Sequence, residues 1–409
     1  MTSTSPRSYR YRWVVLLAFM AVIFVNQLLW ITFASITGPA AKYYGVTDLA
    51  IAALALSFMV VYIVVSVPAS WVIDTYGLRI GVGTGAVLTG VFGLLRGFAG
   101  DNYILVLIAQ IGIAAGQPFL LNAITTVAAR WFLIEERATA SGLGTLAMYA
   151  GQVTALALTP FLVLGSSIPT MLIIYGVVAA IGALIFLVFA RERPPTPASA
   201  AGADERALVF DGLKLALRQR DFQLTLVVFF IGLGVFNGVV TWVEDIVRPR
   251  GFTPVQAGLV GALMVGAGVV GALILPALSD RKRKRVPYIV LGLVMATVGL
   301  AGLTFADQYG WLLVAAAVMG FFLLAAGPIG FQYGAEVTYP APEGTTNGLL
   351  LMIGQVSGIL FILAMDIFKA PVTGSMTSSL LVLIVLMAVG ALLSTRLRES
   401  SMFSRGNVE

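Results

Sequence analysis

The 409-residue chain is 59% apolar and only 11% charged, whereas soluble domains carry about 25% charged residues. It contains no Cys and no His, which excludes disulfides, thiolate metal sites and the side chain that most often carries protons at neutral pH. The net charge of +6 does not indicate nucleic-acid binding, because the basic residues are distributed as in a membrane protein. We therefore predict a multi-pass protein of the lipid bilayer with no cofactor and no metal.

The apolar runs predict an all-α protein with twelve membrane-spanning helices. A span requires about 20 mostly apolar residues, and no run alternates between apolar and polar residues as the strands of a membrane barrel do. The predicted spans cover residues 13–38, 49–73, 80–99, 103–129, 138–164, 169–190, 222–247, 254–278, 286–306, 311–338, 345–368 and 376–395.

The basic residues test this count, because the cytoplasmic loops of membrane proteins are enriched in Lys and Arg. If the N-terminus is cytoplasmic, five of the 25 Lys and Arg residues fall on the outer side and the other 20 on the inner side. The five outer residues are Lys42, Arg96, Arg248, Arg250 and Lys369. The sequence thus predicts a cell-membrane protein with both termini in the cytoplasm.

Polar side chains lie in the middle of the first predicted span, within the stretch VNQLLWITFAS at 25–35. Asn26, Gln27 and Trp30 are spaced i, i+1 and i+4, so they share one face of a helix. Buried polar groups cost free energy in lipid unless they find partners. We predict that this face lines a path through the membrane.

A polar stretch divides the spans into two sets of six. We predict an N-terminal half at residues 1–190, a cytoplasmic linker at 191–221 and a C-terminal half at 222–409. The linker begins RERPPTPASAAGADER, a composition that suits a flexible segment. Residues 206–220 predict an amphipathic helix at the membrane interface.

Two short repeats indicate that the halves are duplicated. Asp74 follows the second span and Asp280 follows the eighth, 206 positions later (280 − 74). Gly-Gln-Val-Thr at 151–154 returns as Gly-Gln-Val-Ser at 354–357, 203 positions later (354 − 151). Two similar offsets favour pseudo-symmetric halves related by an axis along the membrane normal.

The turns that follow the second and eighth spans resemble those of the major facilitator superfamily. That family carries a cytoplasmic Gly-x-x-x-Asp-Arg-x-Gly-Arg turn. Asp74, Gly77 and Arg79 fit this pattern in part, and the second copy keeps Asp280 and Arg281. The resemblance implies a transporter with twelve spans in two six-helix halves.

Seven short strings, spread across both halves, carry a closer resemblance. They are LLWITFASI in the first span, YYGV at 43–46, PASWVIDTYGLR at 68–79, GQPFLLNAI at 116–124, WFLIEERATA at 131–140, EVTYPAPEGTTNGLL at 336–350 and GQVSGIL at 354–360. These strings resemble the branch of that superfamily that contains the feline leukaemia virus subgroup C receptor proteins, described as choline, ethanolamine and haem carriers. The most specific of them is EVTYPAPEGT. The resemblance implies that the substrate is a small organic solute.

Polar side chains near mid-membrane are the candidates for the substrate site. They are Asn26, Gln27, Trp30, Gln117, Gln152, Asn237, Gln332 and Gln355. In the resembled architecture their spans surround a central cavity, and the resemblance places Trp30, Gln117 and Gln355 where an organic cation is held. Asn237 stands where that family usually has an aromatic ring. A lone intramembrane Gln more often joins helices than binds substrate, but a cluster from six spans favours a cavity.

Charged candidates lie nearer the membrane surfaces. Glu244, Asp245 and Asp366 fall toward the outer ends of spans seven and eleven, where we expect a vestibule that concentrates cations. A second set at the predicted cytoplasmic side is expected to latch helix ends, as a gate or as structural contacts. It comprises Asp74, Arg79, Asp280, Arg281 and Glu336.

These candidates predict a class of solute and a source of energy. A quaternary ammonium ion donates no hydrogen bonds, so the indole face of Trp30 is its best partner and contributes up to ~2 kcal/mol. Proton coupling usually requires a titrating group inside the pathway, and no carboxylate lies at mid-membrane in the predicted spans. We therefore expect a facilitative uniporter that moves an organic cation such as choline or ethanolamine by alternating access.

Three other functions stay open. A haem carrier would have to ligate iron through Met or Tyr, because His and Cys are absent. A proton-coupled drug or metabolite exporter would need a titratable central group. A receptor or scaffold that moves nothing would not need converging polar residues. We find no catalytic constellation and predict no enzyme; the expected partners are a small-molecule substrate and the bilayer, with the chain acting as a monomer.

Overall fold

The computed structural model describes residues 9–133, 136–194, 209–341 and 343–399, and the regular secondary structure in these ranges is helical. Twelve of these helical segments are long and apolar enough to cross a membrane, which confirms the predicted count. The chain forms two compact units, residues 1–205 and 206–409. Residues 195–208 of the predicted linker lie outside the described ranges, and the predicted domain boundaries stay predictions.

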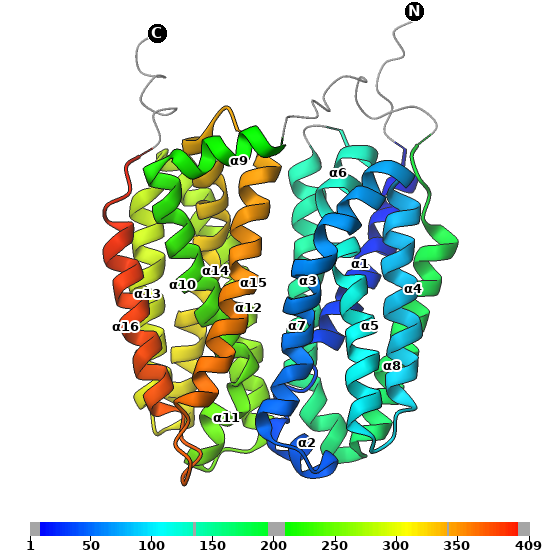
Figure 1. Ribbon diagram of the computed structural model, residues 1–409, viewed down its shortest axis with the longest axis vertical. Coiled ribbons are helices and arrows are strands. Elements are labelled where there is room, and N and C mark those ends of the chain that lie inside the picture. The colour runs from blue at the N-terminus through cyan, green and yellow to red at the C-terminus, as the bar shows by residue number, and fades with distance from the viewer. Residues whose placement is uncertain (1–8, 134–135, 195–208, 342, 400–409) are drawn as a thin grey trace, which may run out of the picture. The chain divides into compact units, whose positions relative to one another are not determined.

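In the first unit, six long segments run side by side (Figure 1, blue to green). Its helices are α1 (Tyr11–Trp30), α2 (Thr37–Tyr44), α3 (Asp48–Tyr76), α4 (Leu78–Gly97), α5 (Tyr103–Leu121), α6 (Ile124–Trp131), α7 (Arg137–Gly165) and α8 (Ile168–Phe189). The short helices α2 and α6 lie at opposite ends of this unit.

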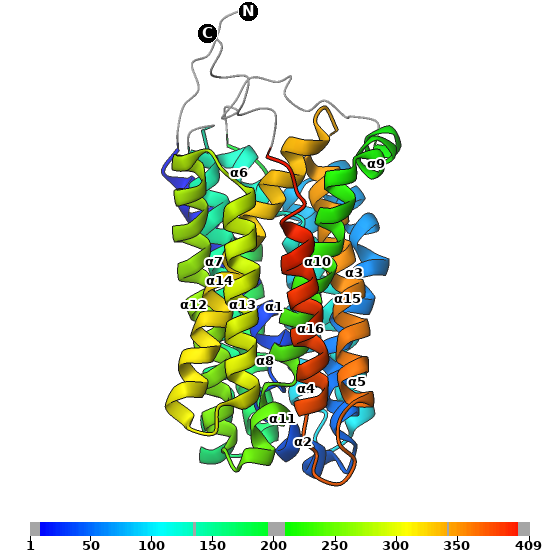
Figure 2. The ribbon, with the colours of Figure 1, turned by 90° about the vertical axis from the view of Figure 1, so that its left-hand side faces the viewer.

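The second unit repeats the arrangement with an additional helix at its start. Its helices are α9 (Val209–Arg218), α10 (Arg220–Thr241), α11 (Val243–Val247), α12 (Pro254–Lys282), α13 (Val286–Phe305), α14 (Tyr309–Thr338), α15 (Glu343–Ile367) and α16 (Thr377–Ser394), with a 3-10 turn, η2, at Arg248–Arg250. Helix α9 lies across one end of the unit (Figures 1 and 2), which confirms a helix within the predicted segment 206–220.

The two units share one packing pattern, which confirms the pseudo-symmetry expected from the sequence repeats. In the first unit α1 packs against α7 and α8, and α4 packs against α5 and α8. In the second unit the corresponding helix α10 packs against α15 and α16, and α13 packs against α14 and α16; Figure 2 shows α10, α13 and α16 in this unit.

The glycine of each Gly-Gln-Val repeat explains part of this pattern. A side chain at Gly151 would collide with the backbone oxygen of Phe24 on α1, and a side chain at Gly354 would collide with Leu233 on α10. Small residues at such contacts allow membrane helices to approach closely. The repeated motif therefore marks the same helix contact in both units.

Three predicted spans are interrupted in the structure. The seventh breaks at Trp242, between α10 and α11, and the first and fourth break near the polar candidates of the first unit. The run 13–38 is not one helix, because α1 ends at Trp30 and the chain turns before α2 begins at Thr37. The fourth span is interrupted between α5 and α6, shortly after Pro118. Each break leaves backbone carbonyls without helical partners, so polar side chains are required nearby.

Candidate functional site

Three of the predicted amides form one hydrogen-bonded chain inside the first unit. Gln152 on α7 donates from Nε2 to Gln27 Oε1 at 3.0 Å, and Gln27 donates to Asn26 Oδ1 at 3.3 Å. Asn26 in turn donates to Thr89 Oγ1 on α4 at 3.1 Å. All four residues are buried, so this chain joins α7, α1 and α4 and fixes the face that the sequence analysis singled out.

Two amide oxygens in the same unit are left without donors. Gln117 Oε1 and Gln152 Oε1 are buried and accept no hydrogen bond from the described residues. Gln117 follows Gly116, whose added Cβ would lie 3.0 Å from Thr89 Oγ1, so this part of α5 packs closely against α4, the helix on which the amide chain ends. A buried acceptor left unpaired costs ~1–3 kcal/mol, and a donor from a solute would remove this cost.

Trp30 is the last residue of α1 and is held by its indole nitrogen. Nε1 donates to the backbone oxygen of Ala55 on α3 at 3.2 Å, and 7% of the residue surface is exposed. The bond fixes the ring at the position where α1 ends. Trp30 therefore contacts α3 at the point where α1 ends, whereas Asn26 and Gln27 form part of the amide chain.

A buried cation lies at the same helix end and donates to its backbone. Arg96 on α4 is fully buried and donates from Nη1 to the backbone oxygen of Leu29 at 3.1 Å and to Gln110 Oε1 at 2.7 Å. Gln110 also donates to the Leu29 oxygen, at 3.2 Å. A cation at the C-terminal end of a helix is favourable because the carbonyl groups there carry partial negative charge.

The charge count places Arg96 at the outer side, but it does not predict the contact of Arg96 with the end of α1. Within the described residues it has no carboxylate partner, and its Nε and Nη2 have no hydrogen-bond partner. Its guanidinium lies 5.8 Å from the ring centre of Phe33. The signal in the sequence was an arginine inside an otherwise apolar span, which by itself indicates a functional or positioning role.

In the second unit the structure brings Asn237 and Gln355 close to each other along α10 and α15. Asn237 Nδ2 donates to the backbone oxygen of Gly354, the neighbour of Gln355, at 3.5 Å. Asn237 is buried and Gln355 is half-buried. Gln332 is different: it is exposed and donates to Glu336 Oε1 at 3.1 Å. Its partner therefore belongs to the charged cluster at the end of α14.

The structure corrects the prediction that the outer carboxylates line a vestibule that concentrates cations. Glu244 and Asp245 on α11 are buried and bind cations of the protein itself. Arg248 pairs with Glu244 Oε2 at 3.1 Å and with Asp245 Oδ1 at 2.7 Å, and Lys369 pairs with the same Asp245 oxygen at 2.7 Å. Two carboxylates and two cations balance, so these carboxylates do not form an open, negatively charged vestibule. Asp366, also predicted there, is half-buried near the end of α15.

At the other end of the first unit, the latch that Asp74 and Arg79 are predicted to form at a helix end is formed by Glu192. Glu192 accepts the backbone N–H groups of Leu78 at 3.0 Å and Arg79 at 2.7 Å, which start α4, and pairs with Arg130. Asp74 is exposed and makes no polar contact among the described residues. The latch predicted at Asp74 is therefore made by a residue that the sequence analysis missed.

In the second unit Asp280 and Glu336 form the expected latch, but their partner is Arg285. Arg285 is buried, pairs with Asp280 and lies 3.0 Å from Glu336 Oε1, whereas Arg281 is exposed. Burial alone would lower the pKa of the Arg285 guanidinium, but hydrogen bonds to Asp280 and Glu336 raise it above its usual value. The guanidinium stays charged, and the cluster is an ion-paired anchor for the start of α13.

Comparison with known proteins identifies the family. The sequence matches the Major Facilitator Superfamily over residues 15–362, a range that begins in α1 and ends in α15. The chain belongs to the major facilitator superfamily. It is therefore a multi-pass membrane transporter, and the two repeated six-span units are the halves of that fold.

Individual members of the superfamily match along most of their length. Solute carrier family 49 member A3 of Danio rerio is 30% identical over 386 residues, covering 90% of this chain and 81% of the relative. The human choline/ethanolamine transporter FLVCR2 is 28% identical, covering 86% and 71%. The mouse choline/ethanolamine transporter FLVCR1 is 29% identical, covering 89% and 70%.

Solved structures support the fold. An inward-facing, unoccupied bacterial homologue of the human lysosomal transporter Spinster superposes with a TM-score of 0.75 at 16% identity, covering 95% of this chain and 97% of that one. A point mutant of the nucleoside transporter NupG gives a TM-score of 0.72 at 13% identity, covering 94% and 99%.

In this transporter the polar groups differ in what they offer a solute. The nitrogens of Asn26, Gln27 and Gln152 are engaged by the protein, whereas the oxygens of Gln117 and Gln152 are available as acceptors. An indole ring and unpaired amide oxygens attract cations and hydroxyl or ammonium donors. They offer little to an anion.

Proposed function

We propose that this transporter carries a small organic cation such as choline or ethanolamine, as a facilitative uniporter that works by alternating access. The observation that carries the proposal is the unpaired, buried Oε1 of Gln117. Choline has one hydroxyl donor and ethanolamine has both hydroxyl and ammonium donors, so each could satisfy this oxygen. The relatives that transport choline and ethanolamine cover most of this chain and support the same class of substrate.

Trp30 is proposed to provide the surface for the positive charge. Its Nε1 is occupied by the Ala55 oxygen, so the ring cannot rotate freely and its face is preorganised. An indole face near a desolvated cation contributes up to ~2 kcal/mol. In the second unit, Gln355 and Asn237 remain predicted substrate-binding residues.

Energy is proposed to come from the substrate gradient and the membrane potential. The buried carboxylates Glu244 and Asp245 are paired with Arg248 and Lys369 at the end of the second unit. The Glu336 carboxylate likewise pairs with Arg285. These carboxylates are therefore already engaged by cations of the protein itself.

We propose a cell-membrane location with both termini in the cytoplasm, because that orientation places 20 of the 25 basic residues inside. The absence of Cys gives a direct test. A single cysteine introduced at exposed Lys42 should react with a membrane-impermeant maleimide added to intact cells, whereas one introduced at exposed Lys282, at the end of α12, should react only after the membrane is permeabilised. Labelling of the Lys42 position from the cytoplasm would reverse the assignment.

The substrate proposal is tested by uptake into proteoliposomes of radiolabelled choline and ethanolamine, with a glutamate control. We expect saturable uptake of at least one amine by the wild-type protein and a large rise in KM for Trp30→Ala. Trp30→Phe, which keeps an aromatic face, should be affected less. Uptake of glutamate alone, or equal uptake by wild type and Trp30→Ala, would reject the proposed site.

A further inference from the structure

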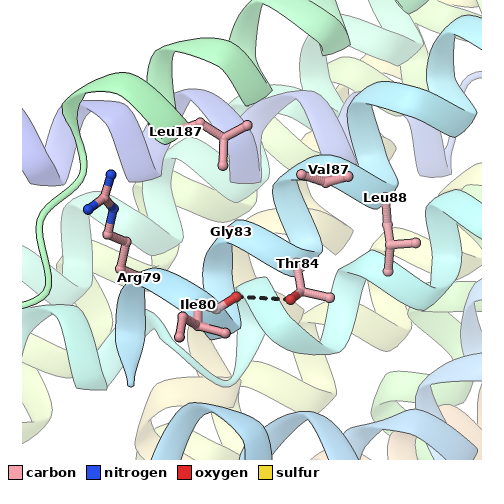
Figure 3. Close-up of a pocket in the computed structure, with 7 residues that line it drawn as sticks. All are labelled: Arg79, Ile80, Gly83, Thr84, Val87, Leu88 and Leu187. Carbon is pink, nitrogen blue, oxygen red and sulfur yellow. Dashed lines mark hydrogen bonds between the residues drawn. The ribbon is translucent and has the colours of Figure 1, made fainter. Parts of the chain in front are cut away.

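A groove of about 530 Å³ runs along the surface of the first unit between α4 and α8. This volume lies within the range of about 300–1,000 Å³ that is usual for small-molecule sites. The residues that line it are Arg79, Ile80, Gly83, Thr84, Val87, Leu88 and Leu187 (Figure 3). It is separate from the amide chain at Asn26 and from the Trp30 contact, so it is not part of the proposed substrate site.

The groove exists because α4 and α8 separate toward the start of α4. Near the other end of α4, an added Cβ at Gly93 would lie 2.9 Å from the Cβ of Ala179, and one at Gly90 would lie 2.8 Å from the Cβ of Ala183. At Gly83 the nearest atom is a methyl carbon of Leu187, 3.7 Å away. The helices thus touch through small residues at one end and leave space at the other.

The walls of this space are apolar and face outward. Ile80 is 54% exposed, Val87 is 43% exposed and Leu187 is 40% exposed. Thr84 adds no free donor, because its hydroxyl donates to the backbone oxygen of Ile80 at 2.9 Å (Figure 3). In a membrane-spanning protein such a surface meets hydrocarbon chains, not water.

One end of the groove carries a positive charge. Arg79 is exposed, and Figure 3 shows its side chain at the end of the groove where α4 begins. Its backbone N–H is bound by Glu192, whose carboxylate is also engaged by Arg130. Within the described residues the Arg79 guanidinium has no ion pair, in contrast to Arg12 and Arg130, which pair with Glu136 and Glu192.

The dimensions match one leaflet of a bilayer. From Arg79 to Leu88 the helix rises about 13 Å, and half of the hydrocarbon core is about 15 Å thick. A cation at the headgroup end, followed by an apolar channel one leaflet long, fits an anionic lipid better than any soluble ligand. We propose that this groove is a binding site for an anionic glycerophospholipid, with the phosphate at Arg79 and one acyl chain along Gly83, Val87 and Leu187.

The proposal is tested on the full chain in detergent by native mass spectrometry and thermal shift, with phosphatidylglycerol titrated against phosphatidylcholine. We expect retained phosphatidylglycerol adducts and a higher melting temperature only with the anionic lipid. Arg79→Gln should weaken this binding about fivefold, the factor expected for one basic side chain at an anionic surface. Arg79→Lys should retain it.

A second pair of variants tests the apolar part independently of charge. Gly83→Leu extends a side chain into the groove and should abolish the adduct. Gly83→Ala is the matched control: its Cβ makes an ordinary contact with Leu187, so it should bind lipid like the wild type. Equal binding by Gly83→Leu and Gly83→Ala, a shift of the same size with phosphatidylcholine, or an equal shift with inorganic phosphate would each overturn the proposal.

Discussion

Glu192 and Glu399 occupy equivalent positions in the two halves of this transporter. Glu192 accepts the backbone N–H groups of Leu78 and Arg79, where α4 starts. Glu399 accepts those of Arg285 and Val286, both at 3.0 Å, where α13 starts. The carboxylates and the first N–H group that each accepts are both 207 positions apart (399 − 192 and 285 − 78). Each of the two units therefore has its own capping carboxylate just after its sixth span.

We predict that each cap contributes to stability in its own half. Glu192→Gln and Glu399→Gln should each lower the free energy of unfolding by about 1 kcal/mol, because a negative charge is lost at a helix N-terminus whose N–H groups lack helical partners. Thermal unfolding in detergent measures this. Asp74→Asn is the matched control, since exposed Asp74 caps nothing in the described structure, and its melting temperature should equal that of the wild type.

The caps show which part of the structure the sequence could predict. Twelve spans follow from hydropathy alone, because each apolar run must be buried in lipid. The identity of the latching residues depends on where each helix ends. In the run Arg281–Arg285, α12 ends at Lys282 and Arg283 adopts a left-handed backbone conformation with φ of 52°. This turn reverses the chain and directs Arg285, not Arg281, to Asp280 and Glu336.

The candidate site could also be predicted only in part from the sequence. The i, i+1, i+4 spacing of Asn26, Gln27 and Trp30 correctly placed polar residues on a buried part of α1. It could not show that Gln27 would donate to Asn26 and accept from Gln152. Nor could an uninterrupted apolar run reveal that α1 ends at Trp30. Both features depend on contacts with helices distant in the sequence.

Gln117 and Gln152 should respond differently to loss of their amides. Gln152 joins α7 to α1 through its Nε2, so Gln152→Leu should destabilise the protein by about 1 kcal/mol. Gln117 Oε1 has no partner in the described structure, so Gln117→Leu should leave the melting temperature unchanged or higher while raising KM for choline at least tenfold. A fall in stability for Gln117→Leu without a change in KM would identify it as a helix contact only.

Arg96 and Gln110 form a second contrasting pair. Burying a cation without a carboxylate is expensive, and replacing it with an apolar residue of similar volume is often neutral or stabilising. Arg96→Met should therefore keep or raise the melting temperature but lower the uptake rate, because the end of α1 that holds Trp30 loses a donor to the Leu29 oxygen. Gln110→Leu should destabilise by about 2 kcal/mol, because it removes an acceptor from the buried charge.

Arg96→Met and Arg96→Lys together show whether Arg96 positions Trp30 or only packs the helices. If Arg96 only packs the helices, Arg96→Met should lower the melting temperature and leave uptake unchanged. If it positions Trp30, the tryptophan emission of Arg96→Met should shift, and Arg96→Lys should restore part of the uptake by returning a donor. Measured together, the spectrum, uptake and melting temperature distinguish the two roles.

The outer ion-pair cluster should be sensitive to removal of its central carboxylate. Asp245 pairs with both Arg248 and Lys369 and is fully buried, so Asp245→Asn removes one carboxylate partner from each cation. Breaking a buried pair in this way costs about 3–5 kcal/mol. The melting temperature should fall markedly, and Asp245→Asn combined with Lys369→Met should recover part of it. Lys42→Gln, at an exposed lysine, is the control and should have no effect.

Uptake should follow the membrane potential and not the pH gradient. A single positive charge crossing 100 mV gains about 2.3 kcal/mol, which corresponds to about fiftyfold accumulation inside a negative compartment. The chain contains no His, and the carboxylates Glu244, Asp245 and Glu336 pair with Arg248, Lys369 and Arg285, so we expect the cycle to run without proton coupling. Proteoliposomes with a valinomycin-imposed potassium potential measure this directly: the initial rate should rise as the interior becomes negative and stay constant when only the pH gradient is changed. Uptake that requires an inward proton gradient at zero potential would show instead that the transporter is proton-coupled.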